Sequence, residues 1–161
     1  MIKHLRIDNR LIHSYVSHAW KDHVGAEVMI ACNDKAANDP FYMMALPMAA
    51  MGKKVLVCSI EDTIKYVKEN PEIPAFVICK HPEDALALLE SNLIIEQVNV
   101  GNAAPIHGTQ YVMVTESVAA TEDDAIVYRK IADKCDGKLY STHIPGAQPI
   151  DFLNALIESG L

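Results

Sequence analysis

The sequence predicts an α/β fold, in which one open, mostly parallel β-sheet carries helices on both faces in a three-layer αβα arrangement. Short apolar runs alternate along the chain with segments of helical periodicity, as in successive βαβ units. Several of these runs are almost continuously apolar, which is typical of strands covered on both faces. A chain of 161 residues has the size of one domain, so we expect a single domain over 1–161.

Seven segments have the composition of strands. In order along the chain they are 2–7, 26–32, 53–59, 75–80, 94–100, 111–115 and 137–144. Open parallel sheets bind ligands and carry out chemistry outside the carboxyl ends of their strands. A functional site is therefore expected among the loops after Ile7, Cys32, Ser59, Lys80 and Val100.

Three helices are predicted from their start signals, over 60–70, 82–92 and 122–134. Ser59 and Thr121 are side chains of the kind that cap a helix N-terminus, and Pro82 suits a first helical position. A fourth helix is expected within 39–52, where Pro47 should kink or shorten it. Its methionines are interpreted most simply as core filler, with a docking surface as the alternative: Met43, Met44, Met48 and Met51.

Composition excludes several classes of function. The net charge of −7 argues against a nucleic-acid or anionic-membrane surface, since both require clustered Lys and Arg. No apolar run reaches the length of a membrane span, and the first residues lack the apolar region of a signal peptide, so a soluble, cytoplasmic protein is expected.

The cysteines predict neither a redox centre nor a metal site. No CxxC pair occurs among them, and three of the four lie inside apolar runs, where Cys is usually a small core hydrophobe: Cys32, Cys58 and Cys79. No set of His, Cys and Asp has metal-ligand spacing. We therefore expect no metal and no cofactor.

The period of the apolar pattern changes after the first predicted strand. The next apolar residues are spaced so that they lie on one face of a helix, and His23 continues the same spacing: Ile12, Val16, Ala19, Trp20 and His23. His13 falls beside this stripe in the first helical turn, facing the loop. That loop is also the only one of those after the strands to carry an acid, an arginine and a histidine together, namely Asp8, Arg10 and His13.

These three side chains are the parts of a phosphohistidine relay. A helix N-terminus disfavours a cationic imidazole, and its free N–H groups suit phosphoryl oxygens. Arg10 can clamp such oxygens. Asp8 either binds Arg10 or accepts the second imidazole N–H, which leaves one ring nitrogen free as the nucleophile. The alternative is an ordinary loop ion pair worth about 0–1 kcal/mol, beside a structural histidine.

Three other polar segments come after predicted strands. The segment 33–34 (Asn-Asp) is interpreted as a turn or cap pair, with a place at the border of the site as the alternative. The segment 80–81 (Lys-His) is a candidate for lending positive charge to a phosphoryl group. The segment 100–108 lacks both GxGxxG and a P-loop lysine, so it predicts a surface loop at the rim of the site rather than a nucleotide site.

The first loop resembles a known family. Its "RIDNRLIH" is similar to the "RIDDRLIHGQV" of enzyme IIB components of the mannose/fructose/sorbose class of the bacterial sugar phosphotransferase system. The segments "ACNDKAANDPF", "VNVGN" and "STHIPGAQPIDF" resemble family segments in the same order, so the likeness spans nearly the whole chain. The family fold is an open α/β sheet with helices on both faces.

The resemblance implies a phosphocarrier, a protein-N(pi)-phosphohistidine–sugar phosphotransferase. His13 would accept a phosphoryl group, through Nδ1, from the IIA component and pass it to a sugar held by the membrane components IIC and IID. Arg10 would stabilise the phosphoryl group and Asp8 would orient the site. The group is carried covalently, without a cofactor. Contact with IIC and IID would place the chain peripherally at the membrane, and a homodimer is a possible assembly.

The chain departs from the family pattern beside the histidine. Asn9 replaces an Asp, and Ser14-Tyr15 replaces Gly-Gln. Ser14 keeps the backbone N–H and adds a hydroxyl that can bind phosphate, whereas Tyr15 is large enough to alter docking. Two alternatives to sugar transport stay open at this point: a phosphorylatable regulatory or binding domain, and a nucleotide or flavin binder, which lacks motif support.

Overall fold

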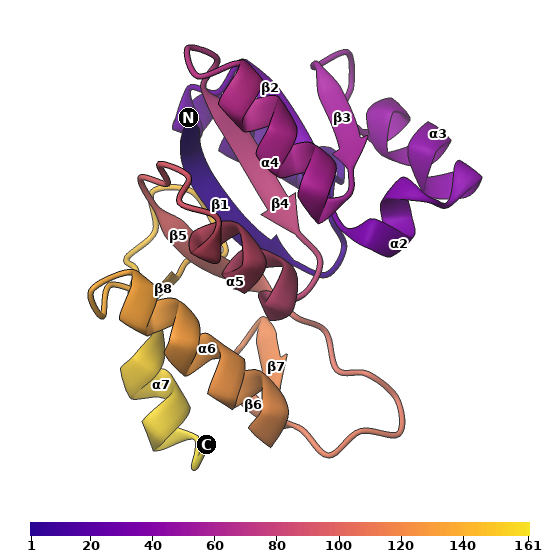
Figure 1. Cartoon of the computed structure of the whole chain (residues 1–161). Helices are drawn as coiled ribbons and strands as arrows, with labels where there is room; N and C mark the ends of the chain where they lie inside the picture. Colours follow the sequence, from indigo (N-terminus) through magenta and orange to yellow (C-terminus); the bar gives the residue numbers. More distant parts are fainter.

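The computed structural model describes residues 1–161 and is built on a seven-stranded sheet of order β3-β2-β4-β1-β5-β8-β9 (Figure 1). All neighbouring pairs are parallel except β8 and β9. The strands are β1 (Ile2–Asp8), β2 (Val28–Cys32), β3 (Val55–Cys58), β4 (Ala75–Cys79), β5 (Val98–Asn102), β8 (Tyr140–Ser141) and β9 (Ile150–Asp151). The predicted fold class is confirmed.

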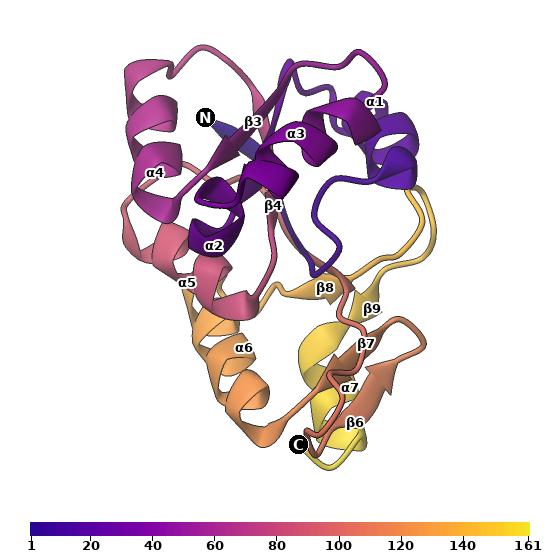
Figure 2. The same ribbon diagram turned by 90° about the vertical axis from the view of Figure 1, so that its right-hand side faces the viewer.

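The helices lie on both sides of this sheet. They are α1 (Lys21–Val24), preceded by the π-helix η1 (Val16–Trp20), then α2 (Asp34–Ala37), α3 (Pro40–Ala49), α4 (Ile60–Glu69), α5 (Pro82–Glu90), α6 (Glu122–Lys134) and α7 (Phe152–Glu158). Figure 2 shows α4, α5 and α6 on one side of the strands and α1 on the other. The helices predicted near 60, 82 and 122 are confirmed, and Ser59 and Thr121 cap two of them.

Alternate residues of the central strands enter two separate cores. Val28, Ile30 and Cys32 of β2 belong to the larger core, whereas Met29 and Ala31 belong to the smaller one. β4 divides in the same way. Helices α4 to α7 close the larger core, and η1, α2 and α3 close the smaller one. The continuous apolar runs of the sequence therefore reflect burial on both faces.

The second half of the chain differs from the predicted elements. The strand predicted over 111–115 exists as β6 (Val112–Thr115), but it pairs only with β7 (Val118–Ala120) in a separate antiparallel hairpin. The strand predicted over 137–144 is reduced to β8, and it is succeeded by β9 and α7, neither of them predicted. The strand predicted over 94–100 begins only at Val98, and the residues before it join β1 through an isolated bridge between Ile2 and Ile95.

The interpretation of the methionines in the segment 39–52 as core filler is wrong. α3 lies against β3, an edge strand, and only Leu46 within this helix is buried. Pro47 is accommodated inside the helix, which runs to Ala49. The four methionines are 48–74% exposed: Met43, Met44, Met48 and Met51. An edge strand offers too little sheet to cover them.

No helix of the structure combines the length and the apolar character that crossing a membrane requires.

Candidate functional site

The loop after β1 is held in one conformation by a turn and two buried anchors. The amide of Leu11 donates to the carbonyl of Asp8 at 2.9 Å, which closes a turn over Asn9 and Arg10. Leu11 has a φ of 57°, a left-handed conformation that is costly for a branched side chain. Leu11 and Ile12 are nevertheless buried in the smaller core, and this burial holds the turn in place.

Helical structure begins at Ser14, so His13 stands immediately before the helix. The carbonyl of His13 accepts hydrogen bonds from the amide of Ser17 at 3.0 Å and from its hydroxyl at 3.1 Å. From Val16 the chain takes the wider π-helical turn. The wider turn contains one more residue and rotates the later side chains about the helix axis. His23, predicted on the apolar face, is therefore exposed, and Ser17 is buried instead.

Asp8 is the centre of the site. Its side chain is fully buried, at 0% exposure, and it accepts hydrogen bonds from Arg10 through both carboxylate oxygens. Arg10 Nε lies 3.0 Å from Oδ1, Arg10 Nη2 lies 3.1 Å from Oδ2, and the Arg10 amide lies 3.2 Å from Oδ1. The sequence left two roles open for Asp8, binding Arg10 or facing His13, and the geometry combines them.

His13 presents one nitrogen to Asp8 and leaves the other free. Nε2 is buried without a hydrogen-bond partner, 3.5 Å from Asp8 Oδ2, whereas Nδ1 is neither bonded nor buried. The side chain as a whole is 22% exposed. A neutral ring with its hydrogen on Nε2, facing the carboxylate, has its lone pair on Nδ1.

Asp8 remains ionised although it is buried. Burial alone would raise the pKa of this carboxyl group, but the adjacent His13 and Arg10 and the charge of Arg6 hold that pKa well below its usual range. The site therefore contains a permanent anion at neutral pH.

Arg6 is a member of the site that the sequence did not predict. Its side chain is fully buried, and its guanidinium donates from Nε and Nη2 to Asp8 Oδ2 at 3.2 and 3.1 Å. Nη1 donates to Asn99 Oδ1 at 2.8 Å and to the Thr142 carbonyl at 3.0 Å. The ring of Trp20 covers the guanidinium, with the Cζ atom 4.7 Å from the ring centroid.

Gly101 makes the space for Arg6. A Cβ atom on Gly101 would overlap the guanidinium of Arg6, so a larger residue at this point of β5 would displace Arg6 from its buried position. In the sequence this glycine belongs to a weak glycine-rich loop and has no distinct signature. In the structure its role is close packing inside the sheet.

The rim of the site is made by segments that the sequence placed there. Asn9 and Asn102 hydrogen-bond through their side chains at 2.9 Å, and the Asn9 amide group also donates to the Ala104 carbonyl, so the segment 100–108 borders the site. Ser14 is exposed beside His13. Tyr15 stacks on His143, with ring centroids 6.1 Å apart.

The other two polar segments, 33–34 and 80–81, make no hydrogen bond with Asp8, Arg10 or His13. Asn33 caps α2, and Asp34 Oδ1 accepts the Ile60 amide at 2.9 Å, which confirms the interpretation as a cap pair. Lys80 donates to the Tyr42 hydroxyl at 3.3 Å. Lys80 shares with Asn9 only the wall of a small cavity of about 50 Å³.

Two of the cysteines of the apolar runs are fully buried, Cys32 and Cys79. Burial raises the pKa of the Cys79 thiol and raises that of the half-buried Cys58 to about 11. These thiols are therefore protonated at neutral pH, and their interpretation as core residues is confirmed. No cluster of three or more His, Cys, Asp or Glu side chains has an arrangement that could hold a metal ion.

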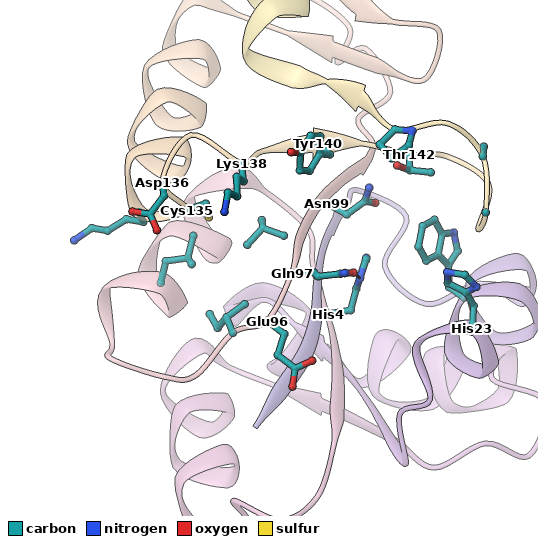
Figure 3. A pocket seen from close by; sticks show the side chains of 18 residues that line it. His4, His23, Glu96, Gln97, Asn99, Cys135, Asp136, Lys138, Tyr140 and Thr142 are labelled. Carbon is teal, nitrogen blue, oxygen red and sulfur yellow. Dashed lines mark hydrogen bonds between the residues drawn. The ribbon is translucent and has the colours of Figure 1, made fainter.

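A large cavity lies beside the site rather than at His13. It has a volume of about 720 Å³, and Figure 3 shows side chains from β1, β5 and the segment around β8 along its wall. Asn99 and Thr142, which bind Arg6, belong to this wall, but Asp8, Arg10 and His13 do not. The candidate phosphoryl site lies outside this cavity, at the carboxyl end of β1, where the side chains of Arg10 and His13 are 41% and 22% exposed.

Comparison with known proteins gives consistent matches along the chain. A family model described as the PTS system sorbose subfamily IIB component matches residues 2–160. The sorbose-specific EIIB component of Klebsiella pneumoniae is 30% identical, with 96% of this chain and 94% of that protein covered. The N-acetylgalactosamine-specific IIB component 1 of Escherichia coli is 29% identical, with coverages of 89% and 90%.

Solved structures agree with these sequence matches. The crystal structure of the IIBSor domain of the Klebsiella pneumoniae sorbose permease superposes with a TM-score of 0.89 at 28% identity, covering 99% of this chain and 98% of that one. Since the family model covers nearly the whole chain and the structures agree in fold, this protein belongs to the sorbose subfamily of IIB components, the phosphocarriers of the sugar phosphotransferase system.

Proposed function

We propose that His13 is the residue that carries the phosphoryl group, and that it does so on Nδ1. The observation that carries this proposal is that the two ring nitrogens of His13 have different surroundings: Nε2 faces the Asp8 carboxylate at 3.5 Å, and Nδ1 is free. The chain would thereby act as a protein-N(pi)-phosphohistidine–sugar phosphotransferase.

The chemistry is a direct displacement at phosphorus. The lone pair of Nδ1 attacks, the P–N bond of the donor's phosphohistidine breaks as the new bond forms, and the donor nitrogen keeps the electron pair. His13 retains the hydrogen on Nε2, so its ring gains positive charge as the bond forms. Asp8 lies beside that hydrogen and stabilises the imidazolium.

Arg10 and the start of the helix provide the donors for the transferred group. The Arg10 side chain is 41% exposed and one turn away from His13, so its guanidinium can bind phosphoryl oxygens. The first amide that is bonded back into the helix is that of Ser17, which leaves the amides of Ser14 and Tyr15 free. The Ser14 hydroxyl adds a further donor.

The phosphoryl group would arrive from a IIA component and leave to a sugar bound by IIC and IID. One relative, the mannose-specific EIIAB component of Escherichia coli, carries both A and B units in its name, and this chain matches 39% of that protein. Exchange with membrane components would place this chain on the cytoplasmic side, associated peripherally with the membrane. The sugar-specific names of the relatives favour transport over a regulatory role.

Phosphorylation of the purified chain with phosphoenolpyruvate, enzyme I, HPr and a IIA component tests the assignment. We expect wild type to be labelled and His13→Ala to be unlabelled, with a ³¹P resonance characteristic of a phosphorylated Nδ1. His18→Ala is the matched control, because His18 is an exposed histidine on the helix that follows His13, and it should be labelled like wild type. Equal labelling of wild type and His13→Ala would refute the proposal.

A further inference from the structure

Two arginines share the Asp8 carboxylate, and they differ in their freedom to move. The side chain of Arg6 is 0% exposed and is held by Asn99, the Thr142 carbonyl and the ring of Trp20. The side chain of Arg10 is 41% exposed, and its only side-chain hydrogen bonds are those to Asp8. Only Arg10 is therefore able to leave the carboxylate.

Asp8 would remain satisfied after Arg10 has turned away. Arg6 Nε and Nη2 still donate to Oδ2, and the backbone amide of Arg10 still donates to Oδ1. The departure of Arg10 Nη2 also removes one of the donors that crowd Oδ2. The Nε2–H of His13, now 3.5 Å away, can then close on that oxygen.

The charges of the site balance only when Arg6 is counted. Before transfer, Asp8 contributes −1 and the two arginines +2, which gives a net charge of +1. The transferred PO₃⁻ unit adds −1 while His13 keeps its hydrogen on Nε2, so the phosphorylated site is neutral. Without Arg6 the same site would be neutral before transfer and would carry −1 afterwards, which disfavours phosphorylation.

We propose that Arg6 is a positioning residue, the fixed counter-ion of Asp8, whose presence frees Arg10 to move from the carboxylate to the phosphoryl group. This rests on the proposed role of His13 and adds a residue to it. Gly101 contributes to this arrangement, because the absence of a side chain there leaves room for the Arg6 guanidinium against β5.

The test is the equilibrium of phosphoryl transfer between a phosphorylated IIA component and the full chain. Arg6→Gln removes the charge and keeps one hydrogen-bonding group, and we expect the ratio of phosphorylated to free chain to fall about tenfold or more. Arg6→Lys keeps the charge but loses the two-pronged contact with Asp8 and the stacking on Trp20, so its ratio should fall less than that of Arg6→Gln. In phosphorylated wild type the Arg10 Nε–H resonance should shift, and in Arg6→Gln it should not.

Val67→Ala is the control that distinguishes a general loss of stability from a specific effect on phosphoryl transfer, because Val67 is a core residue on α4 outside the site. This variant should lose stability and keep the wild-type transfer ratio. If Arg6→Gln fails to fold, Asn99→Ala replaces it, because it removes the 2.8 Å bond to Arg6 Nη1 and should lower the ratio about two- to fivefold.

The outcomes separate the two proposals. An unlabelled wild-type chain refutes the role of His13. A labelled wild type with an unchanged ratio in Arg6→Gln, or in Asn99→Ala where that variant is needed, refutes only the role of Arg6. So does an Arg6→Lys ratio as low as that of Arg6→Gln.

Discussion

At the scale of single residues, Asp8 and Arg6 form a buried ion pair that cannot lose one member cheaply. Asp8→Asn leaves the Arg6 guanidinium buried beside a neutral amide, and an uncompensated buried charge costs about 3–5 kcal/mol. We expect the free energy of unfolding in urea to fall by that amount. Asp22→Asn is the control, since it breaks an exposed pair with Lys53 and should leave the urea midpoint unchanged.

His4 gives the fold a dependence on pH. Burial, which leaves His4 5% exposed, lowers its pKa from 6.5 to about 4. Between these values the unfolded chain binds a proton that the folded protein does not, so stability falls as the pH drops through this window. The change amounts to about 3 kcal/mol.

Urea unfolding at pH 7 and pH 4 measures this effect. His4→Phe keeps a planar ring between Trp20 and Phe76, and it should flatten the difference between the two pH values. A wild-type stability that is equal at both pH values would contradict the assignment to His4.

The residues of the site were predictable to different degrees. Asp8, Arg10 and His13 are local in sequence, and their spacing was enough to place them together. Arg6 was hidden by its setting, since an arginine in a strand ordinarily points to solvent. Its burial depends on Gly101 and Asn99 of a strand remote in sequence. The alternation of His4, Arg6 and Asp8 on one face was the signal available.

At the scale of elements, the sequence was most informative where one structure alone satisfies the pattern. Continuous apolar runs such as 75–79 need cover on both faces, and capped periodic segments such as 122–134 need a helix. The π-helix over Val16–Trp20 leaves no such trace, because inserting one residue into a turn changes spacing without changing composition. The short α7 likewise depends on packing against the larger core.

Substitutions on the exposed face of α3 should change stability much less than substitutions on its buried face. Met48 is 74% exposed, so Met48→Gln should change the free energy of unfolding by less than about 0.5 kcal/mol. Leu46, on the same helix, is 5% exposed, and Leu46→Ala should cost about 2–5 kcal/mol. Thermal and urea unfolding of both variants decide between an exposed methionine face and core filler, which would make Met48→Gln costly as well.

At the scale of the whole molecule, one sheet lies between two cores, and its strands contribute side chains to both sides. Trp20, the single tryptophan, lies in the smaller core. Phe152 of α7 lies in the larger core, where its ring packs on Tyr128 at 4.8 Å. Since strands β1, β2 and β4 contribute side chains to both sides, neither core can lose its packing while the other keeps an intact sheet.

This arrangement predicts one cooperative unfolding transition. Trp20 fluorescence, which reports on the smaller core, should trace the same urea curve as far-UV circular dichroism, which reports on all elements. Phe152→Ala should cost about 3–5 kcal/mol and move both curves together, although its ring is on the far side of the sheet from Trp20. A fluorescence curve that stays in place while the dichroism curve moves would show that the cores unfold separately.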